Sequence, residues 1–115
     1  MSKQSISLLT LTVAAAGVIA ANRFVTPAGA QAGADVNTLG VARTAAAATD
    51  KIPVDVLGST IVEAGAPIAA GATLKSDADG KAITWAAAGA KVAIALEAAT
   101  GAGQFIEVLL IPNAV

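Results

Sequence analysis

The chain has 115 residues, a net charge of −1, and a composition that is 56% apolar but only 13% charged. It contains no cysteine and no histidine, which excludes the usual thiol and imidazole nucleophiles and the common zinc and iron sites. The length fits a single domain. The net charge is slightly negative, and the sequence lacks the cluster of basic residues typical of nucleic-acid-binding proteins.

Catalysis would have to rest on carboxylates or lysines, and these residues are scattered. Of the eight acidic residues, only Asp77 and Asp79 are close in sequence, and they fall in an expected turn. The three aromatic residues are too few for a base-stacking platform. We therefore predict that the protein is not an enzyme, has no catalytic or metal-binding residues, needs no cofactor, and binds no nucleic acid.

The low charge also bears on assembly. Alanine accounts for 31 residues, and its small side chain contributes little transfer free energy when it is buried. A soluble monomer rarely leaves so little of its surface charged. We expect the missing stabilisation to come from oligomerisation or from docking on a larger assembly.

The first segment predicts an extended element. Apolar residues alternate with Ser and Thr over 5–13, with a change of phase at Leu8 and Leu9 that suggests a bulge. This pattern fits an ordinary edge strand, or an arm that adds its backbone to a neighbouring subunit. Residues 1–14 are assigned to this strand or arm, and residues 15–115 to a β domain.

The same N-terminus imitates a secretory signal, with Lys3, an apolar stretch over 8–21 and small residues over 28–32. We do not favour cleavage there, because it would remove half of an internal repeat. The apolar stretch is also shorter than the roughly 20 residues that cross a bilayer, so we predict no membrane partner.

Two stretches of the chain follow one plan. Residues 17–25 are echoed 49 positions later by 66–74, and the segments around Val41 and 52–57 are echoed 53 positions later by those around Ile94 and 105–110. We interpret this as an internal duplication covering about 15–58 and 64–112. Two copies are too few for a solenoid, so the halves should close on each other in one compact domain.

Further strands are expected between Gly and Pro residues, and the alanine run 45–48 is expected to form a loop with one helical turn at most. Asp79-Gly80 predicts a hairpin with a type I′ turn. The pattern Asp77-Ala78-Asp79-Gly80 does not match a calcium-binding loop, because Lys75 and Ala86 occupy positions where that loop needs ligands. The expected strands are 23–26, 38–44, 52–57, 59–64, 73–76, 82–86, 91–96 and 104–111.

Several residues are candidates for an interface. Trp85 could be a core residue or an interface anchor. Arg23 and Arg43 could face solvent or pair with acids of another subunit. The apolar residues of the first segment complete the predicted set, which is Ile6, Leu8, Leu9, Leu11, Arg23, Arg43 and Trp85.

From Ala15 onward, the chain resembles the capsid cement or decoration proteins of tailed bacteriophages. The resemblance rests on glycine and alanine placements rather than on a catalytic signature. The segments that carry it are 23–26, 40–42, 54–58, 68–74, 77–80, 93–99 and 106–110.

The resemblance implies a mainly β fold, a small single-domain β-barrel or β-sandwich of the β-tulip type, built from two related halves with little or no helix. It also implies a homotrimer that binds the major capsid protein on the outer surface of the virion, at threefold and quasi-threefold positions, after synthesis in the host cytoplasm. We expect deletion of residues 2–12 to abolish shell binding without unfolding the domain. The alternatives are a phage tail or baseplate subunit, and a secreted adhesion or carbohydrate-binding β module.

Overall fold

A computed structural model describes residues 5–113, and these residues form β-strands and no helix. The mainly β fold predicted from the sequence is confirmed, and no membrane-crossing helix occurs within 5–113. The strands are β1 (Ser7–Ala14), β2 (Phe24–Val25), β3 (Gly40–Ala42), β4 (Lys51–Glu63), β5 (Thr73–Ser76), β6 (Ala82–Thr84), β7 (Ala93–Ala95) and β8 (Phe105–Leu110).

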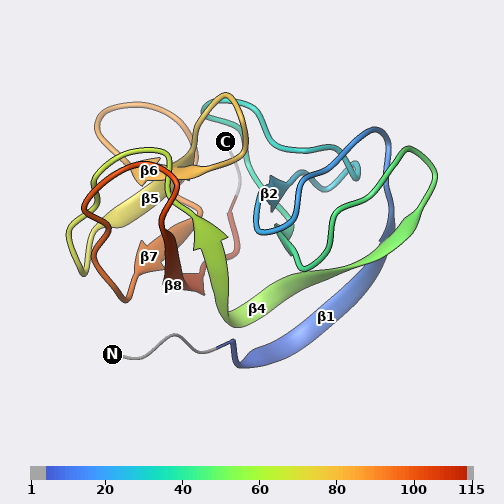
Figure 1. Cartoon of the computed structure of the whole chain (residues 1–115), viewed down its shortest axis with the longest axis horizontal. Helices are drawn as coiled ribbons and strands as arrows, with labels where there is room; N and C mark the ends of the chain where they lie inside the picture. The colour runs from blue at the N-terminus through green and yellow to red at the C-terminus, as the bar shows by residue number, and fades with distance from the viewer. Residues whose placement is uncertain (1–4, 114–115) are drawn as a thin grey trace.

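The strands form one antiparallel sheet that curls into a barrel-like shape (Figure 1). Along the sheet the order is β2-β3-β4-β8-β7-β5-β6, and β1 pairs with β4 off this path. The hairpin between β5 and β6 returns to β2, where the Phe24 N–H donates to the Gly80 carbonyl over 2.8 Å. The sheet is therefore nearly closed, as predicted.

The long strand β4 joins the two halves of the molecule. Two separate strands, 52–57 and 59–64, were predicted here, and that prediction is wrong because the strand continues through Gly58. Gly58 has a φ of 101°, and a side chain there would collide with the carbonyl of Ile6. Glycine lets the chain bend at this point without ending the strand.

The two halves share one backbone plan, which confirms the prediction of a fold built from two related halves. Ile19 bridges Ala46 in the first half, and Ile68 bridges Ala99 in the second, each through two reciprocal backbone hydrogen bonds. The ladder of β1 with the first part of β4 likewise corresponds to the ladder of the last part of β4 with β8. The exact boundaries at 15–58 and 64–112 stay a prediction.

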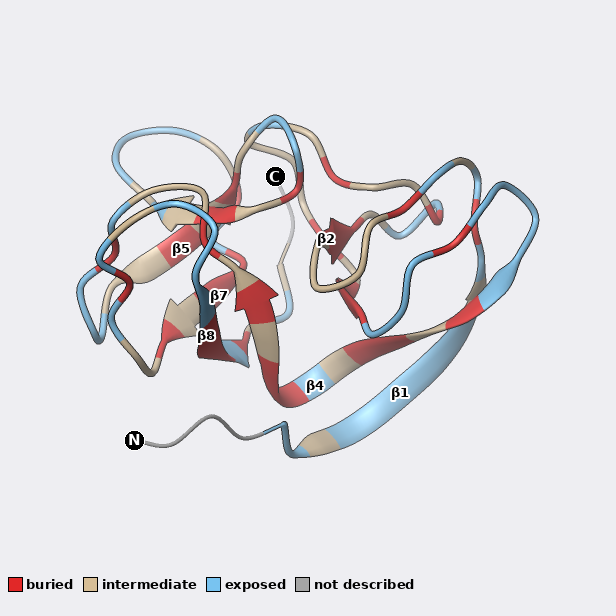
Figure 2. Ribbon diagram, in the orientation of Figure 1, coloured by how far each residue is buried: buried red, intermediate tan, exposed pale blue. Residues whose placement is uncertain are grey.

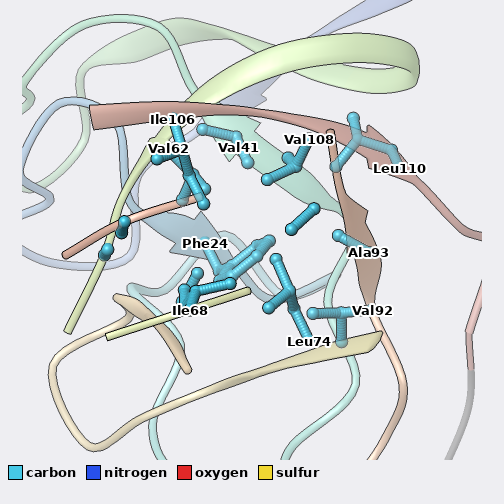
Figure 3. Close-up of a cluster of buried hydrophobic side chains, with 14 of the residues drawn as sticks. Phe24, Val41, Val62, Ile68, Leu74, Val92, Ala93, Ile106, Val108 and Leu110 are labelled. Carbon is cyan, nitrogen blue, oxygen red and sulfur yellow. The ribbon is translucent and has the colours of Figure 1, made fainter. Parts of the chain in front are cut away.

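The main core lies between the halves. Phe24 is fully buried, and Figure 3 shows it at the centre of a cluster with Val41, Val62, Leu74 and other apolar side chains. A smaller cluster around Ile19, Val25, Ile52 and Val54 fills the first half. Because Phe24 belongs to the first half and packs among residues of the second, the halves share one core.

One local prediction needs correction. The β5–β6 hairpin forms, but Asp79 does not have the positive φ that a type I′ turn requires, and only Gly80 does. The Asp77 side chain holds the turn by accepting from the backbone N–H groups of Asp79 and Lys81. Residues 45–48 form a loop, as expected, and Ala46 in it is paired with Ile19.

Candidate interaction surface

An exposed apolar surface follows β1 along its length, and Figure 2 shows the strand mostly pale blue. Leu8 is 72% exposed and Ile6 57%, and Leu9 and Leu11 are also exposed. Three of these predicted interface residues therefore lie on β1, and Ile6 directly precedes it. Within the described residues, β4 is the one strand paired with β1, so the other edge of β1 has no strand beside it.

The change of phase at Leu8 and Leu9 does form an irregularity in the strand. The register with β4 shifts on either side of Leu9, which is paired with Leu57. A bulge bends its strand and redirects side chains. Here it sets the solvent-exposed Leu8 apart from Val13, which packs partly against the core.

A buried carboxylate anchors β1 to the sheet. Asp55 in β4 is fully buried, and it accepts hydrogen bonds from the hydroxyls of Thr10 over 3.0 Å and Thr60 over 2.9 Å. Arg43 adds a longer ion pair, with 3.7 Å between its Nε and Asp55 Oδ2. β1 is therefore an integral part of the sheet, and deleting residues 2–12 would also remove a partner of Asp55.

An open apolar pocket of about 370 Å³ adjoins β1. Leu9 and Leu57 form part of its lining, together with Leu39, Val56 and the C-terminal segment around Pro112. Aliphatic and proline side chains dominate this lining, so the pocket offers shape and apolar contact rather than a charged binding group.

Of the remaining predicted interface residues, Arg43 contacts the carboxylate that also holds β1, whereas Arg23 pairs with a different acid. The Arg23 side chain is 18% exposed, and its Nε lies 3.2 Å from Glu63 Oε1 of the same chain. Arg43 is half exposed beside Asp55. The sequence predicted neither partner, because each pair joins residues well separated in the chain.

Trp85 follows β6, on the opposite side of the molecule from β1 (Figure 1). Its indole N–H donates to the Gly89 carbonyl over 2.9 Å, and the Lys91 ammonium lies 4.5 Å from the ring centroid. The side chain is half-buried, with its polar atom satisfied within its own loop. Its role as an interface anchor stays a prediction.

The comparisons with known proteins agree with this architecture. A family model described as phage cement protein matches residues 3–110 of the chain. The chain belongs to the phage cement protein family. No curated protein sequence matches it.

Among solved structures, this cement protein is similar to the head fiber gp8.5 N base in bacteriophage phi29. The TM-score is 0.73 over 93% of this chain and 97% of that chain, at 20% identity. At this identity the likeness establishes the fold alone. Family membership makes the protein a structural component of a phage capsid, associated with the virion.

Among the described residues of the cement protein, no group of three or more acidic side chains is arranged to hold a metal ion. The exposed apolar residues of β1 and the adjoining pocket are the surface features considered for binding.

Proposed function

We propose that this cement protein decorates the outer surface of the assembled capsid as a homotrimer, at threefold and quasi-threefold positions, and contacts the major capsid protein. Family membership supports the capsid as partner. The observation that carries the choice of surface is the exposed apolar row of β1, which is held rigidly against β4. Exposed apolar residues gathered on one strand mark an interaction site.

Decoration of this kind stabilises a shell by mass action. A protein that binds the assembled lattice and not the free subunits adds its binding free energy to the stability of the lattice. A trimer on a threefold axis also gains from multivalency, because the second and third protomers dock at high effective concentration. Individually weak apolar contacts are then sufficient.

We assign the shell contact to the start of β1, up to and including the bulge, where Leu8 is the extra residue between Ser7 and Leu9. Leu8 is the most exposed residue of the strand, and Ile6 is nearly as open. Ser59, which exchanges hydrogen bonds with Ile6, is paired with Leu109, another exposed leucine. The apolar surface thus continues from β1 onto β8, which gives a contact area wider than one strand.

The test is co-sedimentation of purified protein with expanded, undecorated shells, with Leu8→Asp as the variant. Leu8 is exposed, so the substitution should leave the melting temperature unchanged while the affinity for shells falls by about tenfold or more. The matched control is Val18→Asp, since Val18 is 81% exposed in the loop after β1. Equal binding of the two variants would refute the assignment to β1, and no binding of the unmodified protein to any shell would refute decoration.

A further inference from the structure

The two halves of the chain present corresponding surfaces to different neighbours. The turn at Asn22 corresponds to the turn at Gly71, 49 positions later: both have a positive φ, and their N–H groups donate to the equivalent carbonyls of Ala42 and Ala95. In the same way Ala14 at the end of β1 corresponds to Glu63 at the end of β4. Ala14 pairs with Lys51, the first residue of β4, and Glu63 pairs with Phe105, the first residue of β8.

Inside the molecule, the Asn22 turn covers the outer edge of β4. The Glu63 N–H donates to the Asn22 carbonyl over 3.0 Å, and the Asn22 side-chain amide donates to the Ile61 carbonyl over 3.1 Å. Arg23, beside the turn, forms its ion pair with Glu63. This contact joins the first half to the second.

The corresponding pair of surfaces is open. Ala15 uses its N–H and carbonyl to bond Asp50 and Thr49 across the ladder, so the N–H of Ala14 points to the opposite edge. On that edge the Ala16 N–H donates to the Gly29 carbonyl, as the Gly65 N–H donates to the Ala82 carbonyl in the second half, and no turn among the described residues covers Ala14 as the Asn22 turn covers Glu63. At the other surface, Gly71 is exposed and a Cβ added there would meet no atom within 4 Å. Ala14 and Gly71 are both exposed, whereas their counterparts Glu63 and Asn22 are partly covered.

We propose that the Gly71 turn of one copy of this chain docks on the outer edge of β1 in the next copy, and repeats between molecules the contact that the Asn22 turn makes within one. The Gly71 carbonyl would accept from the Ala14 N–H. Gly71 has no side-chain amide, so the second bond made by Asn22 is not repeated. This proposal rests on the proposed homotrimer and names its contact surfaces.

The charges support this pairing. Ala72, which is half-buried, stands at the position that corresponds to Arg23. Ala14, which is exposed, stands at the position that corresponds to Glu63. Both members of the ion pair are therefore replaced together, and docking would leave no buried charge without a partner. The two alanines also allow the backbones to approach closely.

The placement of the surfaces fixes the kind of assembly. The segment between β4 and β5, which carries Gly71, lies on the opposite side of the molecule from β1 (Figure 1). One copy therefore cannot satisfy both surfaces itself, and the contact is head-to-tail. Contacts of this type close into rings when the rotation permits. The edge near Ala14 then serves the sister copy, while Leu8 in the bulge remains for the shell.

The test re-creates the internal ion pair between copies. Ala14→Glu and Ala72→Arg are each expected to lower the self-association constant by about tenfold, because each introduces a charge without its partner. The double variant is expected to restore association at every contact. An equimolar mixture of the two single variants is expected to restore it only in part, because a ring of three copies must place two copies of one variant side by side. Light scattering measures the mass, and circular dichroism verifies the fold. If the double variant is no better than the single ones, the proposal is overturned.

A second readout covers variants that fold poorly. The chain has no cysteine, so Ala14→Cys and Ala72→Cys each carry one thiol. A short thiol cross-linker should join the two variants to each other when they are mixed, and should not join either one to itself. Self-linking of Ala14→Cys alone, or no mixed product, would overturn the proposal. Shell co-sedimentation of the same samples separates this failure from a failure of capsid decoration.

Discussion

The two ends of β4 make equivalent ladders, with opposite consequences for exposure. At its start, β4 pairs with β1, and the side chains of β1 remain mostly exposed. At its end, β4 takes the role of β1 and pairs with β8, and there Val62 and Ala64 are fully buried. The backbone plan is the same in both places, so the difference comes from what lies outside the ladder.

The outer neighbour at the end of β4 is the Asn22 turn, which covers the edge and brings Arg23 to Glu63. At β1 the outer edge is contacted only near its end among the described residues, where the Ala16 N–H donates to the Gly29 carbonyl, and no turn covers Ala14. The segments outside the ladder therefore decide which side chains are buried, and the first half keeps an exposed surface whose counterpart is covered inside the molecule. We propose this exposed surface as the functional one.

The largest expected contrast is between Phe24→Ala and Leu11→Ala. Phe24 is fully buried in the shared core, and its loss should lower the free energy of unfolding by about 4 kcal/mol. Leu11 is exposed on β1, so its loss should change stability by about 0.5 kcal/mol or less. Urea denaturation measures both, and comparable losses would show that β1 is packed as a core strand.

The next contrast concerns the anchor of β1. Asp55→Ala removes the acceptor of the Thr10 and Thr60 hydroxyls and should cost about 3 kcal/mol, because it leaves the buried Thr60 hydroxyl unpaired and releases Thr10 of β1. Thr10→Val removes one of these bonds and should cost about 1 kcal/mol. Thr10→Ser is the matched control, since it retains the hydroxyl. A loss as large in Thr10→Ser as in Thr10→Val would assign the effect to packing instead.

A smaller effect is expected at the junction between the halves. Arg23→Ala and Glu63→Ala remove a partly buried ion pair that also includes Lys81, 3.4 Å from Glu63. A double-mutant cycle should give a coupling energy of about 1 kcal/mol between Arg23 and Glu63. Near-zero coupling would mean that the backbone bonds of the Asn22 turn hold the junction alone.

The smallest expected effect is a gain. Glu107 is buried in β8, and its Oε1 has no hydrogen-bond partner among the described residues. Burying a carboxylate oxygen without a partner costs free energy. Glu107→Gln removes the formal charge with little change in volume and should raise stability by up to about 1 kcal/mol, measured by thermal unfolding. A loss of stability would show that the carboxylate is paired in solution.

The sequence predicted the features that depend on local pattern. The range of β5 was predicted to the residue, the bulge near Leu9 followed from the change of phase, and the duplicated plan was visible in the spacing. The exposed leucines of β1 were also singled out as interface candidates, and their role in binding stays a prediction. In these cases neighbouring residues decide the structure.

Features set by distant contacts were beyond the pattern. Gly58 is the kind of residue that often ends a strand. Here β4 continues through it, because β4 pairs with β1 before this point and with β8 after it. The run 45–48 was expected to form a loop, but its pairing with Ile19 through Ala46 could not be read from the pattern. Arg23 could have paired with any of eight acids, and only the folded junction selects Glu63.

The most direct test of the account is a cryo-electron microscopy map of shells with and without this protein bound. We predict added density on the outside of the shell at threefold and quasi-threefold positions, with three copies per site and the start of β1 against the capsid. Density on the inner surface, at the tail or at sites without threefold symmetry would contradict the account.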